Sequence, residues 1–596
     1  MKGSTDMMDF TSFYAGGSFE AYEYLGAHLG KNGTTFRTYA PNAVKVFVIG
    51  EWNGWEETQE MLPVIDGNFY ELTCAEAEEG MLYKYRIYRY DGKYIDHCDP
   101  YGYGMELRPH NASYIRDLGK YKFGDKKWIK NRGNIAEKPM NIYELHLGSW
   151  RKKDKKSETG WFTYEEIAVP LASYLTEMGY NYVEFMPVCE HPSDQSWGYQ
   201  NTGYFSPTSR YGTAEQLMYL IDTLHKSGIG VILDWVPVHF AVDNYALADY
   251  DGTPLYEYSS PDIAISEWGS CNFDHKKGEV KSFLQSSAKF WLKEFHFDGL
   301  RLDAISRMIY WMGNEKRGVN QSAVDFLKGL NYRLRDMFPD CILIAEDSTQ
   351  YAKITVPVNS GGLGFDFKWD MGWMHDTLEF FQKSASERRG CYHKLTFSMM
   401  YYYSDRFLLP LSHDETVHGK ATILQKMNGE YPEKFPQARA FYMYMMAHPG
   451  KKLNFMGNEF GHLREWDERE EQDWFLLKYP IHDAFLHFMR DLNKLYLKYP
   501  AFWARDYRED GFRWAECNRT NDLVYAFIRS DGEREILAVF NLSDCEQTYR
   551  LPRAAELLLS SENDIYSGSE HEPEKQLSVD FVKLPRFSAK YYLLNQ

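Results

Sequence analysis

Several features that mark whole classes of protein are missing from this sequence. No apolar run approaches the ~18 residues of a transmembrane helix, and residues 1–6 lack the apolar stretch of a secretory signal. The eight cysteines have neither metal-type nor disulfide-type spacing, so we expect reduced thiols in a cytoplasmic protein. No glycine-rich phosphate loop follows the first strand predicted after residue 140, which disfavours a nucleotide-binding open sheet.

Positive charge is scarce relative to negative charge. The 596 residues include 67 Lys and Arg against 85 Asp and Glu, which gives a net charge of −18. This balance disfavours nucleic acid or an anionic membrane as the main partner. Aromatic residues, by contrast, make up 17% of the chain. They fit large cores, and they also fit a sugar ligand that stacks on rings, so composition alone does not decide between the two.

The apolar pattern divides a chain that is too long for one core. Residues 1–29 form an N-terminal segment, and residues 30–120 read as a β-sandwich because short β-rich runs alternate with turn signals such as Asn53-Gly54. Residues 121–139, polar and basic, are interpreted as a linker. Strands and helices alternate over residues 140–495, and strands alone return over residues 496–596, which predicts a second small β-sandwich.

The alternation over residues 140–495 predicts a (β/α)8 barrel, also called a TIM barrel. Candidate strands lie at 142–146, 182–186, 231–234, 297–303, 341–346, 407–413 and 453–456. Thr213 is expected to cap a helix in which Leu217, Leu220, Ile221 and Leu224 share one face. A doubly wound open sheet is the alternative. The predicted fold is therefore a multidomain α/β protein with a central barrel flanked by two β-sandwiches.

Four acidic residues, Asp234, Asp303, Glu346 and Asp414, end or follow apolar runs of this barrel. Burying an unpaired charge is costly, and active-site groups of such barrels sit at the C-terminal tips of several strands. Any one of these acids, taken alone, is more often a helix cap or a surface ion pair. Their joint occurrence at strand tips is what favours catalysis.

The spacing of Arg301 and Asp303 places both side chains on one face of a strand. A neighbouring cation lowers the pKa of an acid, so we expect Arg301 to keep Asp303 ionised. Glu346, surrounded by other acids, is expected to hold a proton. One ionised and one protonated carboxyl are the equipment for splitting a glycosidic bond, with retention of configuration if they lie ~5–5.5 Å apart.

Histidines near these acids also admit a metal site, at Asp234 and His239 or at His413 and Asp414. The sequence has neither the His-x-x-x-His nor the paired-Cys spacing of zinc sites, so we expect no metal and no cofactor.

These segments resemble the α-amylase superfamily, glycoside hydrolase family 13. Its signature regions match residues 234–239, 299–303, 346–347 and 413–414. The resemblance implies that Asp303 is the nucleophile, Glu346 the general acid/base and Asp414 the stabiliser of the transition state. It also implies that the substrate is held by Tyr199, Asp234, His239, Arg301 and His413.

Longer runs are similar to the glycogen-branching subgroup of that superfamily. They lie at 144–150, 197–213, 251–257, 368–376, 409–420 and 455–466, and residues 40–55 resemble a family-48 carbohydrate-binding module. The resemblance implies an enzyme that transfers chains of α-1,4-glucan or glycogen to a 6-hydroxyl. We expect a monomer, although no sequence feature addresses the oligomeric state. Departures from the subgroup pattern leave acceptor preference and transferred-chain length open; they are Arg307, Asp370, Thr416, Asn458 and His462.

Two alternative functions stay open. A debranching or trehalose-releasing hydrolase of the same superfamily would share the catalytic residues, and a non-catalytic glucan-binding scaffold would share the N-terminal module. Trp373, Met374 and Trp466 are candidate contacts for an acceptor chain, and each is equally readable as barrel packing.

Overall fold

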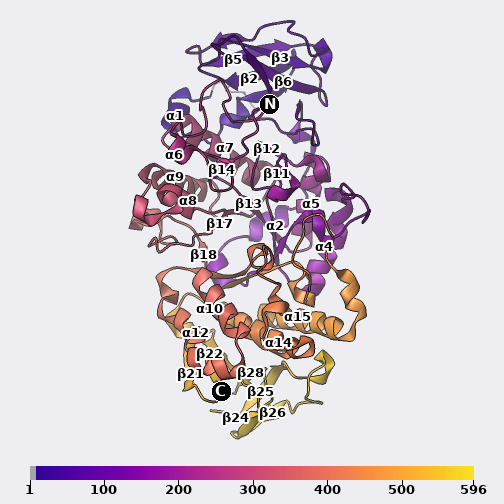
Figure 1. The fold of residues 1–596 in the computed structure, drawn as a ribbon, viewed down its shortest axis with the longest axis vertical. Coiled ribbons are helices and arrows are strands. Elements are labelled where there is room, and N and C mark those ends of the chain that lie inside the picture. Colours follow the sequence, from indigo (N-terminus) through magenta and orange to yellow (C-terminus); the bar gives the residue numbers. More distant parts are fainter. Residues whose placement is uncertain (1–7, 596) are drawn as a thin grey trace.

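The computed structural model describes residues 8–595. The first six residues, on which the expectation of no secretory signal rests, lie outside this range. Figure 1 shows the parts of the chain in sequence along the long axis, with the N-terminal sheets at one end, the barrel in the middle and the C-terminal sheets at the other end. Within the described residues, every helix is too short or too polar to cross a membrane.

Antiparallel sheets form the N-terminal part, as the alternating pattern predicts. One sheet has the order β1 (Gly26–Gly30), β2 (Gly33–Tyr39), β5 (Phe69–Cys74) and β4 (Leu62–Val64), and the other contains β3 (Lys45–Gly50), β6 (Leu82–Tyr88), β7 (Tyr94–His97) and β8 (Ser113–Tyr114). Phe36, Val46 and Val48 are buried between them. Helix α1 (Phe10–Ala15) precedes β1, and the sequence pattern did not predict it.

Parallel strands close the central barrel, which confirms the predicted fold class. Among residues 8–595 the ring contains eight of them: β9 (Asn141–Leu145), β10 (Tyr182–Phe185), β13 (Gly230–Trp235), β16 (Gly299–Leu302), β17 (Ile342–Ala345), β18 (Phe367–Trp369), β19 (Phe407–Leu411) and β20 (Lys451–Phe455). β18 is only three residues long and was not predicted as a strand. The open-sheet alternative is excluded because β20 pairs with β9 and completes the ring.

The helices around the barrel are α4 (Tyr164–Met178), α5 (Ala214–Lys226), α7 (Gly278–Glu294), α9 (Gln321–Met337), α10 (Met371–Gln382), α14 (Tyr431–Ala447) and α15 (Pro480–Lys498). Thr213 caps α5 by accepting a hydrogen bond from Gln216 N, as expected. The predicted apolar face of α5 is buried. In the described connection from β17 to β18, the short 3-10 helix η9 (Val358–Ser360) replaces the usual α-helix.

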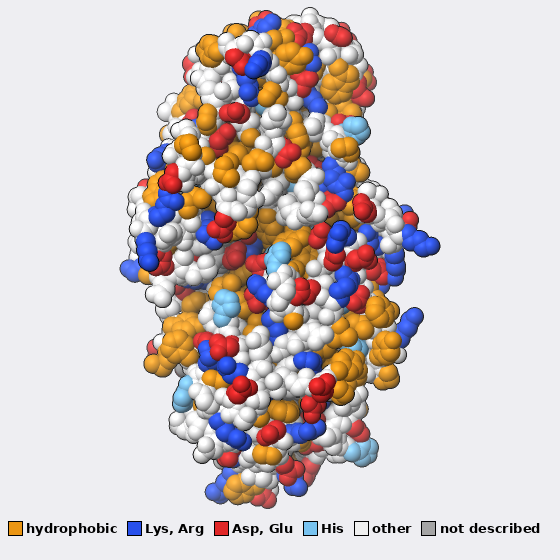
Figure 2. Space-filling view, viewed as in Figure 1, with side chains coloured by type: hydrophobic (Ala, Val, Ile, Leu, Met, Phe, Trp, Pro, Cys, Tyr) orange, Lys and Arg blue, Asp and Glu red, His pale blue; other side chains and the backbone are white. Residues whose placement is uncertain are grey.

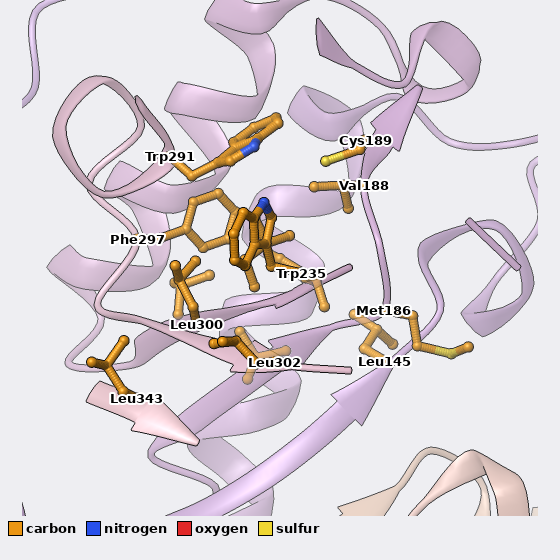
Figure 3. Packing of buried hydrophobic residues seen from close by; sticks show 14 of the residues in the cluster. Leu145, Met186, Val188, Cys189, Trp235, Trp291, Phe297, Leu300, Leu302 and Leu343 are labelled. Carbon is orange, nitrogen blue, oxygen red and sulfur yellow. The ribbon is translucent and has the colours of Figure 1, made fainter. Parts of the chain in front are cut away.

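The packing of β16 fixes which of its side chains reach the barrel interior. Figure 3 shows Leu300 and Leu302 among buried hydrophobic residues that include Trp291 of α7 and Trp235 of β13. Successive strand residues point to opposite faces, so burial of both leucines against the outer helices turns Arg301 to the inside of the barrel. The buried Trp291 Nε1 is satisfied by a hydrogen bond to Tyr204 O at 3.0 Å.

The predicted linker and the barrel's last helix differ from the expected division of the chain. Residues 121–139 contain helix α2 (Lys126–Asn131), and α15 extends to Lys498, past the expected boundary after residue 495. Beyond it, one sheet has the order β21 (Phe512–Arg519), β22 (Val524–Ser530), β23 (Glu535–Asn541), β28 (Ser588–Leu594), β25 (Ala555–Ser560) and β26 (Gln576–Leu577), and β24 (Gln547–Arg550) pairs with β27 (Phe581–Leu584).

Candidate active site

A cavity of about 460 Å³ opens at the C-terminal ends of the barrel strands. Figure 2 shows histidine and acidic side chains gathered at mid-height on the face of the molecule, in a hollow bordered by hydrophobic side chains. The cavity is lined by Gln195, Ser196, Trp197, Tyr199, Gln200, His239, Trp268, Asp303, Ala304, Glu346, His413, Asp414 and His418. Six of the eight residues predicted for the site are therefore on its wall.

The other two predicted residues, Asp234 and Arg301, lie directly beneath the cavity wall. Arg301 on β16 is in register with Asp234 on β13. Its Nη1 donates to both oxygens of Asp234 at 2.6 Å and to Asp303 Oδ1 at 2.9 Å. Its Nη2 donates to Glu346 Oε2 at 2.8 Å. One buried guanidinium therefore holds three carboxylates, and Asp303 and Glu346 flank it.

The hydrogen bonds of Glu346 separate the roles of its two oxygens. Oε2 accepts from Arg301 Nη2 and also from Ala304 N at 2.9 Å. An oxygen that accepts from two donors is the unprotonated oxygen of a carboxyl group. Among the described residues Oε1 has no hydrogen-bond partner, so Oε1 is the oxygen that can carry a proton toward a ligand. Asp303 likewise uses Oδ1 for Arg301 and leaves Oδ2 free.

The expected direction of the Asp303 pKa is wrong. Burial raises the pKa of Asp303 well above its usual range, the Arg301 cation opposes the rise, and the carboxylates of Glu346, Asp234 and Asp414 add to it. Burial also raises the pKa of Asp234, against the opposing effect of Arg301. The sequence shows Arg301 as a neighbour of Asp303, but the three acids that crowd Asp303 come from other strands.

His413 is held from behind by Glu144, which is buried on β9. Glu144 Oε2 accepts a hydrogen bond from His413 N at 2.8 Å. The other oxygen, Oε1, lies 2.6 Å from His413 Nδ1. Burial works against protonation of the ring, but Glu144 and Asp414 raise the pKa of His413 to about 9. Partial burial works against ionisation of Asp414, and the nearby cations of His413 and Arg301 lower its pKa overall.

Tyr199 and His239 complete the predicted set from two other sides. Tyr199 donates its hydroxyl hydrogen to Asp234 Oδ2 at 2.6 Å, and its ring stacks on His413 with the centroids 5.7 Å apart. Burial lowers the pKa of His239 to about 4, so this ring is neutral near pH 7. Trp268, whose ring centroid lies 5.2 Å from that of His239, adds a half-exposed aromatic surface to the cavity rim.

Sequence reasoning missed several cavity residues and misjudged others. Trp197 carried a signal, because it lies two residues from Tyr199. Glu144 begins the run 144–150 that resembles the branching subgroup, but that resemblance gave it no role, and nothing in the sequence around Trp268 marked a site. Trp373 and Met374 lie on the buried face of α10 and are each 1% exposed, so they are barrel packing and not acceptor contacts. Trp466 is also buried, and it supports the site from behind by packing against Trp197.

The acid-rich site has no metal-type geometry within residues 8–595. No group of three His, Cys, Asp or Glu side chains there converges as metal ligands would. Both oxygens of Asp234 already accept from Arg301, and His239 lies on the cavity wall without contacting that carboxylate. The arrangement instead offers two carboxyl groups with free oxygens toward one cavity, which is equipment for acid–base and nucleophilic chemistry.

Three protein-family models match separate parts of the chain. Carbohydrate-binding module 48 (isoamylase N-terminal domain) matches residues 24–102, the alpha amylase catalytic domain matches residues 169–252, and the alpha amylase C-terminal all-beta domain matches residues 514–592.

Curated relatives match over most of their own length. The 1,4-alpha-glucan branching enzyme GlgB of Fusobacterium nucleatum is 45% identical over 536 residues, which are 89% of this chain and 87% of that enzyme. GlgB of Bacillus caldolyticus is 41% identical over 588 residues, which are 97% of this chain and 88% of that enzyme. A pullulanase from Anoxybacillus sp. LM18-11, solved with maltotetraose, has a TM-score of 0.75 at 18% identity and covers 100% of this chain and 90% of its own. That last likeness concerns the fold alone.

Proposed function

This chain belongs to the 1,4-alpha-glucan branching enzyme family, and from that premise we propose that Asp303 and Glu346 carry out the transfer of a glucan chain from an α-1,4 bond to a 6-hydroxyl. The observation that carries these roles is Arg301, whose two terminal nitrogens bind Asp303 and Glu346 and leave one oxygen of each acid free at the same cavity. A pair of carboxyl groups facing one sugar is the equipment of glycoside-cleaving enzymes, and we propose that this pair works with retention of configuration.

In the first step, Asp303 Oδ2 attacks C1 of a glucose within an α-1,4-glucan. The C1–O4 bond breaks, and the proton on Glu346 Oε1 passes to the departing oxygen, which leaves a chain with a new 4-hydroxyl. Bond formation at Asp303 removes a negative charge from a crowded set of acids. The burial and repulsion that raise the pKa of Asp303 therefore favour its reaction with C1.

In the second step, Glu346 takes the proton of a glucan 6-hydroxyl, and that oxygen displaces Asp303 from C1 to form an α-1,6 branch. Water competes for the same intermediate at ~55 M, so the acceptor chain must win through positioning. The aromatic rim of the cavity, with Trp197 and the half-exposed Trp268, supports the binding of such a chain.

The remaining predicted residues are proposed to hold the sugar in the first step. Asp414, with 44% of its side chain exposed, faces the cavity beside His413 and can accept from ring hydroxyls. His413 and His239 approach from different sides, and Tyr199 offers its ring as a platform under the reacting glucose. Asp234 has no free oxygen, so its role is to fix Arg301 and Tyr199.

The finer statements about the whole protein also remain proposals. We propose glycogen as the natural polymer, a monomeric enzyme, and a cytoplasmic location, which fits eight cysteines that are all unpaired in the structure. We also propose the functional division predicted from sequence, with a carbohydrate-binding module at 30–120 and the catalytic barrel from residue 140 to the end of α15 at Lys498.

The linkage of the products made from amylose tests the proposed function. The protein is incubated with amylose, and new α-1,6 linkages are followed by proton NMR alongside reducing ends. We expect α-1,6 signals to grow while reducing ends stay nearly constant. Reducing ends that rise without α-1,6 signals would instead identify a hydrolase, and cleavage of pullulan would identify a debranching enzyme. A parallel preparation of Asp303→Asn controls for contaminating amylases.

A further inference from the structure

Glu144 grips His413 at two points, although it lies 269 residues earlier in the chain. One carboxylate oxygen accepts from the backbone N–H of His413 at 2.8 Å, and the other contacts ring Nδ1 at 2.6 Å. Glu144 and His413 are 0% and 3% exposed. A bidentate contact to both the backbone and the ring fixes the side-chain rotamer as well as the position of the histidine.

Resting on the proposed function, we propose that Glu144 is a positioning residue that holds His413 as an imidazolium, with Nε2–H turned into the catalytic cavity. Glu144 does not line the cavity, so it acts on the sugar only through His413.

The protonation state of His413 follows from the hydrogens that its neighbours have available. Arg301 Nη1 donates to both oxygens of Asp234, so Asp234 is a carboxylate and Tyr199 must donate its single hydroxyl hydrogen to it. The Tyr199 oxygen can then only accept from His413 Nε2, which lies 3.4 Å away. In this proposal Glu144 is a carboxylate, so Nδ1, which lies 2.6 Å from one of its oxygens, donates to it. Both ring nitrogens therefore carry hydrogen.

Charges on every side of the ring act on this imidazolium. Nε2 lies 3.7 Å from Asp414 Oδ1, so the cation also faces the proposed stabiliser of the transition state. Burial and the Arg301 cation oppose protonation of the His413 ring. The titratable or charged groups that face the ring are Glu144 from β9, Glu184 from β10, Asp234 from β13, Arg301 from β16, Tyr199 and His146 from loops, and the adjacent Asp414.

Glu184 provides a matched comparison in the same layer of the barrel. It is the register partner of Glu144 on the neighbouring strand and is also 0% exposed. Within the described part of the chain, neither of its oxygens has a hydrogen-bond partner. Burial raises the pKa of Glu184 well above its usual range, and this side chain makes no hydrogen bond to His413.

The variant Glu144→Gln tests the proposal through the pH profile of kcat for branching. The isosteric amide removes the negative charge, so the alkaline limb should move from near pH 9 toward the ordinary histidine value of 6.5. Relative to the parent, activity should then fall by about 30-fold at pH 8 and by less than about twofold at pH 6. Glu184→Gln should leave the alkaline limb unchanged.

Loss of a merely structural residue would lower activity by one factor at every pH. A Glu144→Gln profile that is parallel to the parent profile therefore overturns the proposal, as does an equal shift in Glu184→Gln. If Glu144→Gln fails to fold, histidine ring 15N NMR of the parent decides. We expect an imidazolium signal at pH 8 that disappears in His413→Asn, and a neutral ring at that position overturns the proposal. This readout needs no activity, so it stays valid even if amylose shows no branching.

Discussion

Arg301 is the residue on which the acid set converges, because Asp234, Asp303 and Glu346 share its two terminal nitrogens. The guanidinium is buried and its Cζ lies 4.4 Å above the centre of the Trp369 ring. A planar group that is bound on both edges and stacked on one face has a single orientation. The positions of the proposed nucleophile and acid therefore depend on a side chain that does not itself line the cavity.

Asp303→Asn should abolish branching while glucan affinity is largely kept. The amide is a poor nucleophile, and removal of a covalent catalyst lowers kcat by about 10⁴-fold or more. Proton NMR of amylose products measures the rate, and retardation in glycogen-containing gels measures affinity. The control is Asp222→Asn on α5, whose carboxylate binds Tyr121 and Lys226 away from the cavity. A variant at position 303 with parental activity would contradict the assignment of the nucleophile.

At the residue scale, the sequence predicts identities better than charge states. Asp303 and Glu346 are visible because each ends an apolar run, and the fold brings them to one cavity as expected. Glu144 lies inside the short strand β9, and its partner His413 follows β19 far along the chain, so no local signal connects them. The direction of the Asp303 pKa was missed for the same reason, since burial and crowding come from distant strands.

Helix α2 shows at the scale of elements how the predicted linker is attached to the barrel. Trp128 Nε1 donates to Asp298 Oδ1 at 2.8 Å, and the Trp128 ring stacks on His225 with the centroids 5.4 Å apart. His225 lies between Asp125 and Asp298, with its ring nitrogens 2.9 and 3.0 Å from the two carboxylates. Polar, basic residues thus cover a buried ion-pair cluster, which composition alone could not reveal.

The stability of this attachment should fall as pH rises through about 8. Burial opposes protonation of His225, but Asp298 and Asp125 raise its pKa to about 8. A group whose pKa is raised on folding stabilises the protein fully below its unfolded value of 6.5 and loses that contribution above its folded value. The shift corresponds to about 2 kcal/mol in the free energy of unfolding, to be measured by urea unfolding at pH 6 and pH 9.

The variant His225→Gln should remove this part of the pH dependence. His571→Gln serves as its control, because His571 has 80% of its side chain exposed and lies in the C-terminal part. If the difference between pH 6 and pH 9 is the same in His225→Gln as in the parent, the cluster does not stabilise the attachment in this way.

Long, periodic elements were predicted well, and short or irregular ones were not. The apolar stripe of α5 and its Thr213 cap were both visible in sequence and are both present. β18 was missed because three residues, Phe367–Trp369, are too few for any periodicity to appear. The expected strand–helix alternation also fails between β17 and β18, where the connection contains only the short η9.

The whole molecule is held together by buried charges between the barrel and the C-terminal sheet. Asp506 accepts from Lys451 Nζ of β20 at 3.0 Å and from Arg529 Nη2 of β22 at 2.8 Å. Arg529 Nη1 also donates to Ala447 O at the end of α14, at 2.7 Å. All three charged side chains are fully buried. The two parts therefore share one polar network as well as an apolar core.

Asp506→Asn should lower the free energy of unfolding by about 3–5 kcal/mol, because it leaves Lys451 and Arg529 buried with reduced compensation. Urea unfolding followed by tryptophan fluorescence measures this loss. The control is Arg513→Ala, which removes a surface ion pair with Glu535 and should change stability by about 0–1 kcal/mol. Similar losses in the two variants would show that the buried network does not join the two parts.

Helix α14 lies between the last barrel helix and the C-terminal sheet, and its residues 437–447 are all buried. Its Arg439 donates to Ser561 O at 2.5 Å, and its Met443 O accepts from Tyr591 of β28. A recombinant between two relatives should therefore fold well only if α14, α15 and the last sheet all come from the same parent. A crossover near residue 498, between α15 and the C-terminal sheet, would pack helices from one parent against a sheet from another.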